Sequence, residues 1–344
     1  MTAGARLPVG VVGANGFLGG ELVRLLSAHP RVEIAACVAG SSAGRSLGEV
    51  RPSLRGVDRV LESFDADALA ARCAVVFLAL PHGESEAAAA QLVPRGARVI
   101  DLGSDLRLRD PADARRWYKR DPKAPELCAE AFYGLPELTG APPDGWRAIA
   151  NPGCFATALA MLLAPLAPRL PAGAPVHVFG VTGSSGSGIQ PSAGVHHALR
   201  ATSFVAYKPL VHQHLGELGQ LLGQLPGSRV PDVRFVPHSL PTARGIHLTA
   251  MIRRDDLDGD ALELLRARYA GARLVDVGPG EVPMGAVQGS CRVALGVAGD
   301  DRTVVVYAAI DNLLKGGSGQ AVQNLNLGLG WDELTGLPAV GMWP

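Results

Sequence analysis

The chain of 344 residues carries 32 basic and 32 acidic side chains, so its net charge is zero and no basic stripe indicates nucleic acid as a partner. Hydrophobic residues make up 47% of the chain and charged residues 19%, which argues against wholesale disorder and favours two domains with sizeable cores. Five cysteines occur without a C-x-x-C pair, which argues against a disulfide framework and a zinc site.

The amino-terminal sequence enters a strand-like segment, RLPVGVVG, with no signal-peptide pattern before it. No window approaches about 18 uninterrupted apolar residues, the length that a membrane-spanning helix needs. We therefore expect a soluble, cytoplasmic protein that acts on a small molecule and has neither a membrane nor a nucleic acid as a partner.

Strand and helix patterns alternate over the first hundred residues. Apolar strand runs at 8–14, 32–40, 74–80 and 97–103 are separated by helical patterns, among them 16–30 and 85–96. Nearly continuous apolar strands that alternate with helices predict a doubly wound parallel sheet of the Rossmann type. Pro and Gly recur from 110 to 153, and we interpret that stretch as loops that lead to a second domain.

A glycine-rich turn follows the first strand and opens the first helix. Its G-x-x-G-x-x-G spacing lets the backbone turn tightly and lets a pyrophosphate approach the N–H groups of the helix N-terminus. The commoner dinucleotide motif is G-x-G-x-x-G, so the strand before the turn and the helix after it carry the prediction; the alternative is a plain strand-to-helix turn. The expected cofactor contacts are Gly13, Ala14, Asn15, Gly16, Phe17 and Leu18.

The loop after the second strand indicates which dinucleotide binds. An NAD enzyme needs an acid at the end of that strand to bind the ribose hydroxyls, whereas Glu33 lies at its start, on the wrong side. Ser41, Ser42 and Arg45 fit a 2′-phosphate better than a diol, so the loop predicts NADP(H). The alternative is that these three side chains are solvated loop residues.

The segment NPGCFATA, residues 151–158, places Cys154 after an Asn-Pro-Gly turn and at the head of a predicted helix, 155–168. A helix N-terminus favours thiolate over thiol. We therefore predict that Cys154 is a nucleophile. The remaining cysteines lie in settings that indicate structural roles: Cys37 and Cys73 in or beside strands, Cys128 in a loop and Cys291 before an apolar run.

The second half of the chain has a different pattern. Apolar runs at 175–183, 233–241, 245–254 and 303–311 are widely spaced and partly alternating, with helical patterns at 260–271 and 319–330. They predict an α+β domain with a mixed, largely antiparallel sheet that has one covered face. We expect an NADP-binding domain at 1–153, completed by a C-terminal helix at about 312–344, and a catalytic and oligomerisation domain at 154–311.

A nucleophilic cysteine needs a histidine within hydrogen-bond reach. The densest histidine cluster is YKPLVHQHLGEL, which holds His212 and His214 and continues to Glu217; His196-His197 is the rival pair. In an extended segment the alternate spacing places His212 and His214 on one face, so that one can catalyse while the other orients or binds the substrate. No third ligand accompanies them, so we expect no metal.

Two further segments suit an anionic substrate. The small-residue loop VTGSSGSG, 181–188, offers backbone N–H groups and hydroxyls, and its alternative is a flexible linker. Arg244 precedes a predicted strand, where its guanidinium can grip a carboxylate bidentately or form a structural salt bridge.

Together these segments resemble the N-acetyl-gamma-glutamyl-phosphate reductases, the NADPH-dependent enzymes of arginine biosynthesis. The resemblance covers nearly the whole chain and rests on nine segments in order: GANGFLGGELVRLLSAHP, VVFLALPHG, VIDLGSDLRL, FYGLPEL, ANPGCFATA, TGSSGSG, HQHLGEL, PTARGI and AIDNLLKGGSGQAVQNLNL. The reaction chemistry of the family is similar to that of the aspartate-semialdehyde and glyceraldehyde-3-phosphate dehydrogenases.

The resemblance implies that Cys154 accepts the acyl group and that His212 is the acid/base, with His214 as the next candidate. It implies a thioester intermediate and cofactor contacts that include Pro81 and, at the nicotinamide end, Asn312. The apolar sheet faces of the second domain predict a homodimer or homotetramer. The implied substrate contacts are Arg107, Asn151, Ser184, Ser185 and Arg244. The family often has G-G-H-R-H where this chain has PLVHQH.

Other functions remain open at this stage. Reductases that act on a carrier-protein-linked aminoadipyl phosphate, in lysine biosynthesis, are the runner-up. A non-catalytic dinucleotide-binding redox sensor needs neither the H-x-H segment nor the small-residue loop, and a cysteine hydrolase needs no NADPH.

Overall fold

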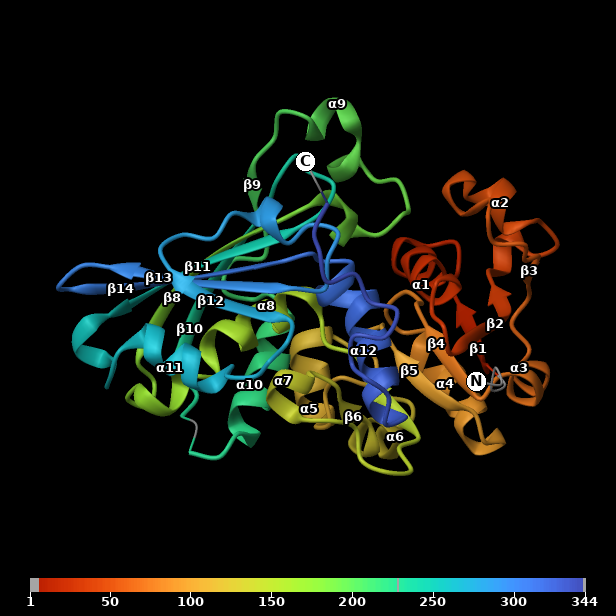
Figure 1. Ribbon diagram of the computed structural model, residues 1–344, viewed down its shortest axis with the longest axis horizontal. Coiled ribbons are helices and arrows are strands. Elements are labelled where there is room, and N and C mark those ends of the chain that lie inside the picture. Colours follow the sequence, from red (N-terminus) through yellow and green to blue (C-terminus); the bar gives the residue numbers. More distant parts are fainter. Residues whose placement is uncertain (1–5, 228, 343–344) are drawn as a thin grey trace. The chain divides into compact units, whose positions relative to one another are not determined.

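The computed structural model describes residues 6–227 and 229–342, which form two compact units (Figure 1). The first unit consists of the chain up to Pro152 and of the segment Gly317–Leu337. The second takes Gly153–Gly316 and the segment from Pro338 onward. Residues 1–5 and 343–344 of the predicted domain ranges lie outside the described residues.

The first unit is built on a parallel sheet, seven-stranded in the part of the chain that the structure describes. The strand order is β3-β2-β1-β4-β5-β7-β6, and every pairing between neighbours is parallel. This confirms the Rossmann-type sheet, because β1 lies centrally and the chain winds outward in both directions. The strands are Leu7–Val12 (β1), Val32–Val38 (β2), Leu61–Glu62 (β3), Val75–Leu78 (β4), Arg98–Asp101 (β5), Phe132–Tyr133 (β6) and Ala148–Ala150 (β7).

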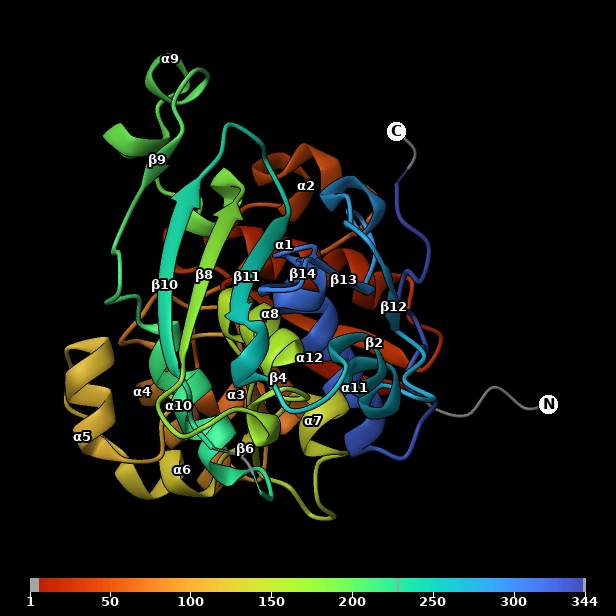
Figure 2. The same ribbon diagram turned by 90° about the vertical axis from the view of Figure 1, so that its left-hand side faces the viewer.

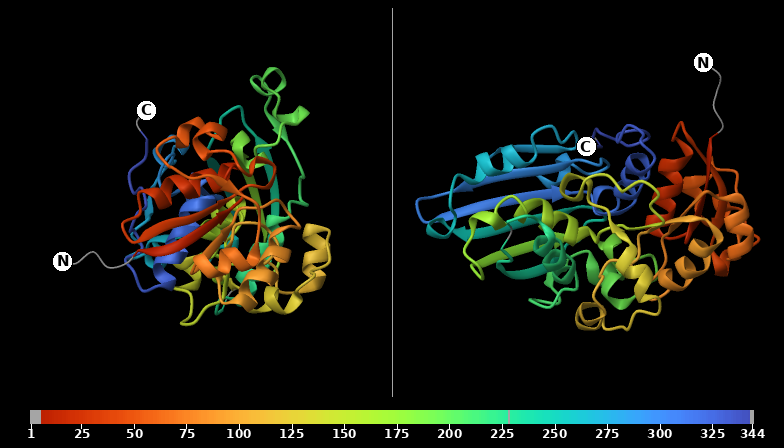
Figure 3. Two further views of the ribbon diagram at one scale, coloured as in Figure 1. Left: turned by 90° about the vertical axis from the view of Figure 1, so that its right-hand side faces the viewer. Right: turned by 90° about the horizontal axis from the view of Figure 1, so that it is seen from below.

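Helices cover this sheet; α1 packs with α12, and α3 packs with α4 (Figure 3). The amphipathic pattern that predicted α1 has Leu22, Val23 and Leu26 on its buried side. The helices of the unit are Phe17–Ser27 (α1), Leu47–Val50 (α2), Ala66–Arg72 (α3), Ser85–Leu92 (α4), Pro111–Asp113 (α5), Pro125–Glu130 (α6), Pro136–Thr139 (α7) and Gly319–Gly328 (α12).

The prediction that 110–153 consists of loops is wrong. This stretch carries α5, α6, α7 and the two strands β6 and β7, which extend the first sheet. Pro111, Pro125 and Pro136 are the first residues of short helices, a position where proline costs no hydrogen bond, so these prolines do not indicate loops. Cys128 accordingly lies in a helix, α6, and not in a loop.

The C-terminal helix is shorter than expected. It runs from a π-helical turn, Leu314–Ser318, through α12 and ends at Gly328, short of the predicted 344. Polar contacts hold α12 in the first unit: the side-chain amides of Gln320 and Asn324 both donate to the carbonyl of Gly134. The return segment therefore belongs to the first unit through buried amide hydrogen bonds as well as apolar contacts.

The second unit holds a mixed sheet, with seven strands among its described residues in the order β12-β13-β14-β11-β8-β10-β9. The β8–β10 and β12–β13 pairs are parallel, whereas the other neighbouring pairs are antiparallel. This confirms the largely antiparallel sheet. The strands are Pro175–Thr182 (β8), Val205–Ala206 (β9), Asp232–Ser239 (β10), Ile246–Arg253 (β11), Val275–Pro279 (β12), Val293–Gly299 (β13) and Thr303–Ile310 (β14).

One face of this sheet is covered by helices. Figure 2 shows β10, β8 and β11 side by side, with α8 and α10 behind them. The residues that alternate along β8 show the two faces, because Val176 and Val178 are fully buried whereas Phe179 is 46% exposed. The helices of the unit are Cys154–Leu163 (α8), His197–Arg200 (α9), His214–Gln224 (α10) and Ala261–Arg268 (α11). Within residues 6–227 and 229–342, no helix is long and apolar enough to cross a membrane.

Candidate active site

Cys154 is the first residue of α8, and Gly153 caps that helix in an extended conformation. The rest of α8 is buried, whereas Cys154 is partly exposed. The helix N-terminus presents unpaired N–H groups and a partial positive charge, which favour a thiolate at this position. Cys154 therefore combines accessibility with an electropositive position.

The other cysteines are buried. Burial raises the pKa of the Cys37 and Cys128 thiols to about 12 and also raises the pKa of Cys73. Thiols in such surroundings stay protonated and inert at neutral pH. Their environment thus differs from that of Cys154 in the way the sequence predicted.

Gly316 packs directly on Cys154. A Cβ atom built on Gly316 would lie 2.7 Å from the Cβ of Cys154, closer than real side chains approach. Only glycine leaves room for Cys154 at this contact. No local sequence pattern indicates this contact, because 162 positions separate the two residues.

The imidazole of His214 lies against the backbone just before Cys154. His214 is the first residue of α10, and a side chain at Gly153 would overlap its Nε2 atom. Glu217, one turn further along α10, is fully buried and accepts a hydrogen bond from the Gly153 N–H (2.9 Å). Its other carboxylate oxygen lies 3.8 Å from His214 Nε2. One buried carboxylate thus joins the imidazole to the N-cap of the cysteine helix.

His212 lies in a more apolar place than His214. Its ring is 3% exposed and makes edge-on contacts with Phe155, Phe235 and Tyr207. Burial, assisted by the neighbouring His214 and Lys208, lowers the pKa of His212 to about 2. The His214 N–H donates to Nδ1 of His212 (3.3 Å), so the proton of the neutral ring lies on Nε2.

The expected extended geometry of the H-x-H segment is wrong. His212 lies in a turn that follows Leu210, whose φ is +63°, and His214 begins a helix. The turn nevertheless brings the two rings together, with centroids 4.7 Å apart. Their proximity therefore comes from the turn and not from strand alternation.

Tyr207 is a site residue that the sequence analysis missed. Burial first, and then the proximity of the Cys154 sulfur, raise the pKa of its hydroxyl, which places that hydroxyl near Cys154. Its N–H is anchored by the carbonyl of Pro237 (3.0 Å). The available signal was its position in YKPLVHQH, five residues before His212.

The small-residue loop is an ordered 3-10 turn, Ser184–Ser187, and not a flexible linker. The N–H groups of Ser184 and Ser185 donate to the carbonyls of Thr242 and Ala243, so these two N–H groups are already used within the unit. The Ser184 hydroxyl also donates to Thr242 O (3.1 Å). The loop can therefore offer a substrate the Ser185 hydroxyl rather than these two backbone donors.

Asn312 and Arg244 belong to one network in the second unit. The Asn312 side chain accepts from the N–H of Gly245 (2.8 Å) and donates to the Ser185 hydroxyl (2.9 Å). Arg244 Nη1 lies 3.6 Å from the buried carboxylate of Asp311. Arg244 thus forms the salt bridge that the sequence left as its alternative role, and Asn312 joins two loops of the same unit.

The dinucleotide turn of the first unit has the geometry that a pyrophosphate needs. Gly13 has a φ of +82°, and a side chain there would overlap the carbonyl of Ala79. A side chain at Gly19 would overlap the carbonyl of Gly13. No side chain caps the N-terminus of α1, so its first N–H groups are available to an anion. The residues present therefore fit NADP(H).

The loop beyond β2 is tied to this turn. The Asn15 side chain donates to the Ser42 hydroxyl (3.3 Å), whereas Ser41 and Arg45 are exposed. Arg51, which the sequence analysis missed, donates from Nε to the carbonyl of Asn15 (2.7 Å). Its charge lies beside the dinucleotide turn although 36 residues separate the two.

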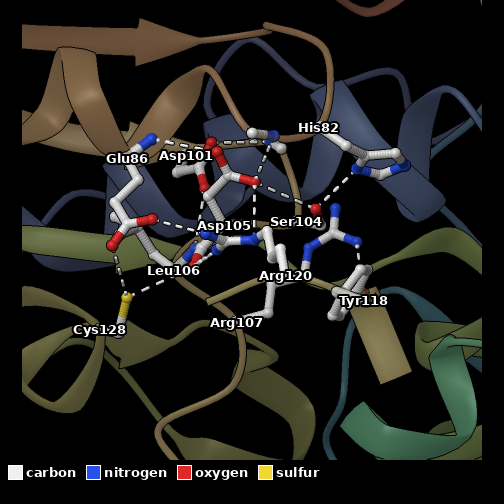
Figure 4. Close-up of polar contacts among 12 residues, drawn as sticks. His82, Glu86, Asp101, Ser104, Asp105, Leu106, Arg107, Tyr118, Arg120 and Cys128 are labelled. Carbon is white, nitrogen blue, oxygen red and sulfur yellow. Dashed lines mark hydrogen bonds and ion pairs between the residues drawn. The ribbon is translucent and has the colours of Figure 1, made fainter. Parts of the chain in front are cut away.

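Arg107 is buried in the loop that follows β5 (Figure 4). Its Nε donates to the carbonyl of Asn151 and its Nη2 to that of Leu102 (both 2.8 Å), and its Nη1 lies 3.5 Å from the Tyr118 hydroxyl. Buried Asp101 holds the loop by accepting from the N–H of Gly103 (2.7 Å). Burial, and then the nearby Asp105, raise the pKa of Asp101 to about 6.

The remaining predicted residues have varied surroundings. The Asn151 side chain donates to Gly317 O (3.1 Å) and accepts from Asn324, so it fastens the return segment within the first unit. Pro81 is exposed in the loop after β4, and His196 and His197 are exposed at the start of α9. No group of three or more potential metal ligands occurs among the described residues.

Comparison with known proteins finds family matches over most of the chain. The semialdehyde dehydrogenase NAD binding domain matches residues 8–142, and the semialdehyde dehydrogenase dimerisation domain matches residues 154–312. N-acetyl-gamma-glutamyl-phosphate reductase from Laribacter hongkongensis is 43% identical over 98% of this chain and 100% of its own length. The chain belongs to the N-acetyl-gamma-glutamyl-phosphate reductase family. Relatives of the same name from Desulforudis audaxviator and Azotobacter vinelandii are 42% and 41% identical, over 98% of this chain and 100% of their own length.

Solved structures of low sequence identity share the fold of this chain. Aspartate semialdehyde dehydrogenase II from Vibrio cholerae, complexed with ASA, has a TM-score of 0.69 at 15% identity and covers 94% of this chain and 98% of its own. The Candida albicans aspartate semialdehyde dehydrogenase with NADP has a TM-score of 0.65 at 18% identity, over 92% of this chain and 97% of its own. These likenesses support the two-domain architecture alone.

Proposed function

We propose that this chain reduces N-acetyl-gamma-glutamyl phosphate to N-acetylglutamate semialdehyde and inorganic phosphate in arginine biosynthesis, through a thioester on Cys154. The observation that carries the proposal is the partly exposed Cys154 at the N-terminus of α8, with His214 and Glu217 against its N-cap. The names of relatives that are 43% and 42% identical support the choice of substrate.

The first half-reaction is acyl transfer to sulfur. The Cys154 thiolate attacks the acyl carbon, the bond from that carbon to the phosphate oxygen breaks, and the phosphate leaves with the electron pair and takes up a proton. The resulting thioester is a far better electrophile for a hydride than a carboxylate. Bound NADPH supplies that hydride. Collapse of the reduced adduct releases the aldehyde and returns the thiolate to Cys154.

We assign the acid/base role to His214 ahead of His212, which reverses the order that the family resemblance implies. The low pKa of His212 keeps its ring neutral at physiological pH, so it makes a poor proton donor but a fixed Nε2–H donor that can orient a substrate. The buried Glu217 carboxylate lies 3.8 Å from His214 Nε2 and accepts from the Gly153 N–H, so it can orient this imidazole at the N-cap of the cysteine helix. Tyr207 completes the surroundings of the sulfur.

We assign cofactor binding to the first unit. Gly13, Gly16 and the first turn of α1 would hold the pyrophosphate, and the loop of Ser41, Ser42 and Arg45 would hold the 2′-phosphate. The nicotinamide-end contacts Pro81 and Asn312 and the substrate contacts Arg107, Asn151, Ser184, Ser185 and Arg244 remain part of this proposal. Among the substrate contacts, Arg107 is the candidate cation for the phosphoryl group.

We further propose a homodimer or homotetramer formed through the open face of the second sheet. Phe179 of β8 and Met251 of the adjacent β11 are 46% and 36% exposed on that face, and the family match there is to a dimerisation domain. Sedimentation of the wild type and of Phe179→Asp tests it, since the substitution should yield monomers. No disulfide joins the described cysteines, which supports a cytoplasmic location.

The reverse reaction tests the proposed function. NADP reduction should require both N-acetylglutamate semialdehyde and inorganic phosphate, and His214→Asn should slow it by about 10²–10⁴-fold, more than His212→Asn does. Activity that needs a carrier-linked aminoadipate semialdehyde would favour the lysine-pathway reductases. A larger loss in His212→Asn would restore the original order of the two histidines.

A further inference from the structure

Arg200, the last residue of α9, is a buried arginine of the second unit that no step of the proposed mechanism uses. It is 9% exposed, whereas residues 196–199 and 201–202 around it are exposed, the apolar Leu199 at 63%. The segment therefore turns a charged side chain inward and an apolar one outward, which is the reverse of what a stable core requires. This inversion indicates a function for the charge.

The guanidinium of Arg200 has no charged partner within the described ranges 6–227 and 229–342. It donates to two neutral acceptors, the Ser239 hydroxyl and the Leu240 carbonyl, and its buried Nε has no hydrogen-bond partner there. A guanidinium stays protonated in proteins, and burying it without an opposite charge is unfavourable. An anionic ligand would supply both the missing charge and the missing acceptor.

Arg200 and Tyr207 are fastened to the same end of β10. Arg200 bonds to Ser239 and Leu240 at the carboxyl end of that strand, and the Tyr207 N–H donates to the carbonyl of Pro237 (3.0 Å). Figure 2 shows α9 and β9 at this end of β10. The two side chains therefore belong to one edge of the second sheet.

Tyr207 connects Arg200 with the cysteine. Burial raises the pKa of the Tyr207 hydroxyl, the Cys154 sulfur raises it further and the Arg200 charge opposes them, so that both groups lie near this hydroxyl. The Tyr207 ring also makes an edge-on contact with the His212 ring, with centroids 5.8 Å apart. Within the second unit, a buried positive charge and the reactive sulfur thus flank one hydroxyl.

We propose that Arg200 binds the α-carboxylate of the substrate while Cys154 holds its acyl group. This inference rests on the proposed function. The carboxylate and the acyl carbon lie at the two ends of one short carbon chain and stay joined through both half-reactions, so a cation that holds the carboxylate must lie near Cys154. A guanidinium can hold a carboxylate through two parallel N–H···O bonds. Because the residues around Arg200 are exposed, a small shift of α9 brings the carboxylate to Nε.

A substrate without the carboxylate tests the contact. In 4-acetamidobutanal a hydrogen replaces the α-carboxylate of N-acetylglutamate semialdehyde, whereas the aldehyde and the acetamide remain. Both aldehydes are assayed with NADP and phosphate in the reverse reaction of the wild type, Arg200→Met and Arg200→Lys. Arg266→Met is the matched control, because Arg266 is exposed on α11 and pairs with Glu263 (2.9 Å).

We expect Arg200→Met to lower kcat/KM for the semialdehyde by about 10–100-fold, the effect of losing charge-assisted hydrogen bonds. The kcat/KM for 4-acetamidobutanal and the KM for phosphate should stay unchanged, and Arg266→Met should behave as the wild type. Arg200→Lys keeps the charge without the planar fork, so its loss should be smaller and equally confined to the semialdehyde. This variant decides the question if Arg200→Met does not fold.

Two results would overturn the inference while the reductase activity stands. An equal loss with both aldehydes would give Arg200 a structural role, and a rise confined to the KM for phosphate would make it a phosphate ligand. If the wild type shows no activity with the semialdehyde, the proposed function fails. Protection of Cys154 from iodoacetamide then decides the inference: protection by N-acetylglutamate but not by 4-acetamidobutyrate, lost in Arg200→Met, would support it, and equal protection by both would overturn it.

Discussion

Replacing Gly316 by alanine tests how closely the structure holds the reactive sulfur. The added Cβ would lie 2.7 Å from the Cβ of Cys154, whereas real Cβ contacts essentially never fall below 3.0 Å and nine in ten exceed 3.4 Å, so the two segments must separate by about 0.3–0.7 Å. Displacements approaching 1 Å cost up to about 10²-fold in rate when they misalign reacting groups. We expect kcat to fall by about 10–100-fold, and the free energy of unfolding to fall by about 1–3 kcal/mol from overpacking.

The assay combines steady-state kinetics with the rate of Cys154 alkylation by iodoacetamide. Gly219→Ala is the matched control, because Gly219 lies in α10 with open space around its Cβ position, and alanine there should stabilise the helix by about 0.5–1 kcal/mol. Gly316→Ala with wild-type kcat and a wild-type alkylation rate would refute the close packing on which the site rests.

Three further predictions concern charge. Glu217→Gln keeps an acceptor for the Gly153 N–H but removes the charge beside His214, so Cys154 alkylation at pH 7 should slow several-fold; an unchanged rate would contradict the role of Glu217. Because the Asp101 pKa is raised from 3.8 to about 6, its contribution to stability is present below pH 4 and is lost as pH rises through 6. Urea unfolding from pH 4 to 7 should therefore show that the free energy of unfolding falls by about 3 kcal/mol in the wild type and that Asp101→Asn removes this fall. Identical pH profiles of the two proteins would contradict the raised pKa of Asp101. Arg45→Ala should raise the KM for NADPH more than that for NADH, and equal changes would remove Arg45 from the 2′-phosphate site.

The sequence predicted the first sheet well because its strands are buried on both faces and separated by amphipathic helices. The loop prediction for 110–153 failed for a physical reason. Proline breaks the interior of a helix but suits its first position, and the frequency of proline in a stretch does not show which of these positions Pro111, Pro125 and Pro136 occupy. The strands β6 and β7, of two and three residues, are too short to give a periodic pattern.

The site was predictable to the extent that its chemistry is local. The turn before Cys154 predicted a helix N-terminus at that residue, and HQHLGEL predicted the histidine cluster. Strand alternation does not describe the conformation of that cluster, because the positive φ of Leu210 and the start of α10 bring the rings together. Contacts such as Gly316 on Cys154 join residues far apart in the chain, and no local pattern encodes them.

Trapping the acyl-enzyme tests the central claim most directly. The wild type is incubated with N-acetylglutamate semialdehyde and NADP in the absence of phosphate, quenched in acid, digested and analysed by mass spectrometry. We expect one N-acetylglutamyl group on the peptide that contains Cys154, its release on addition of inorganic phosphate, and no label in Cys154→Ser. An enzyme that turns over with no label on Cys154, or with the label on another cysteine, would contradict the account.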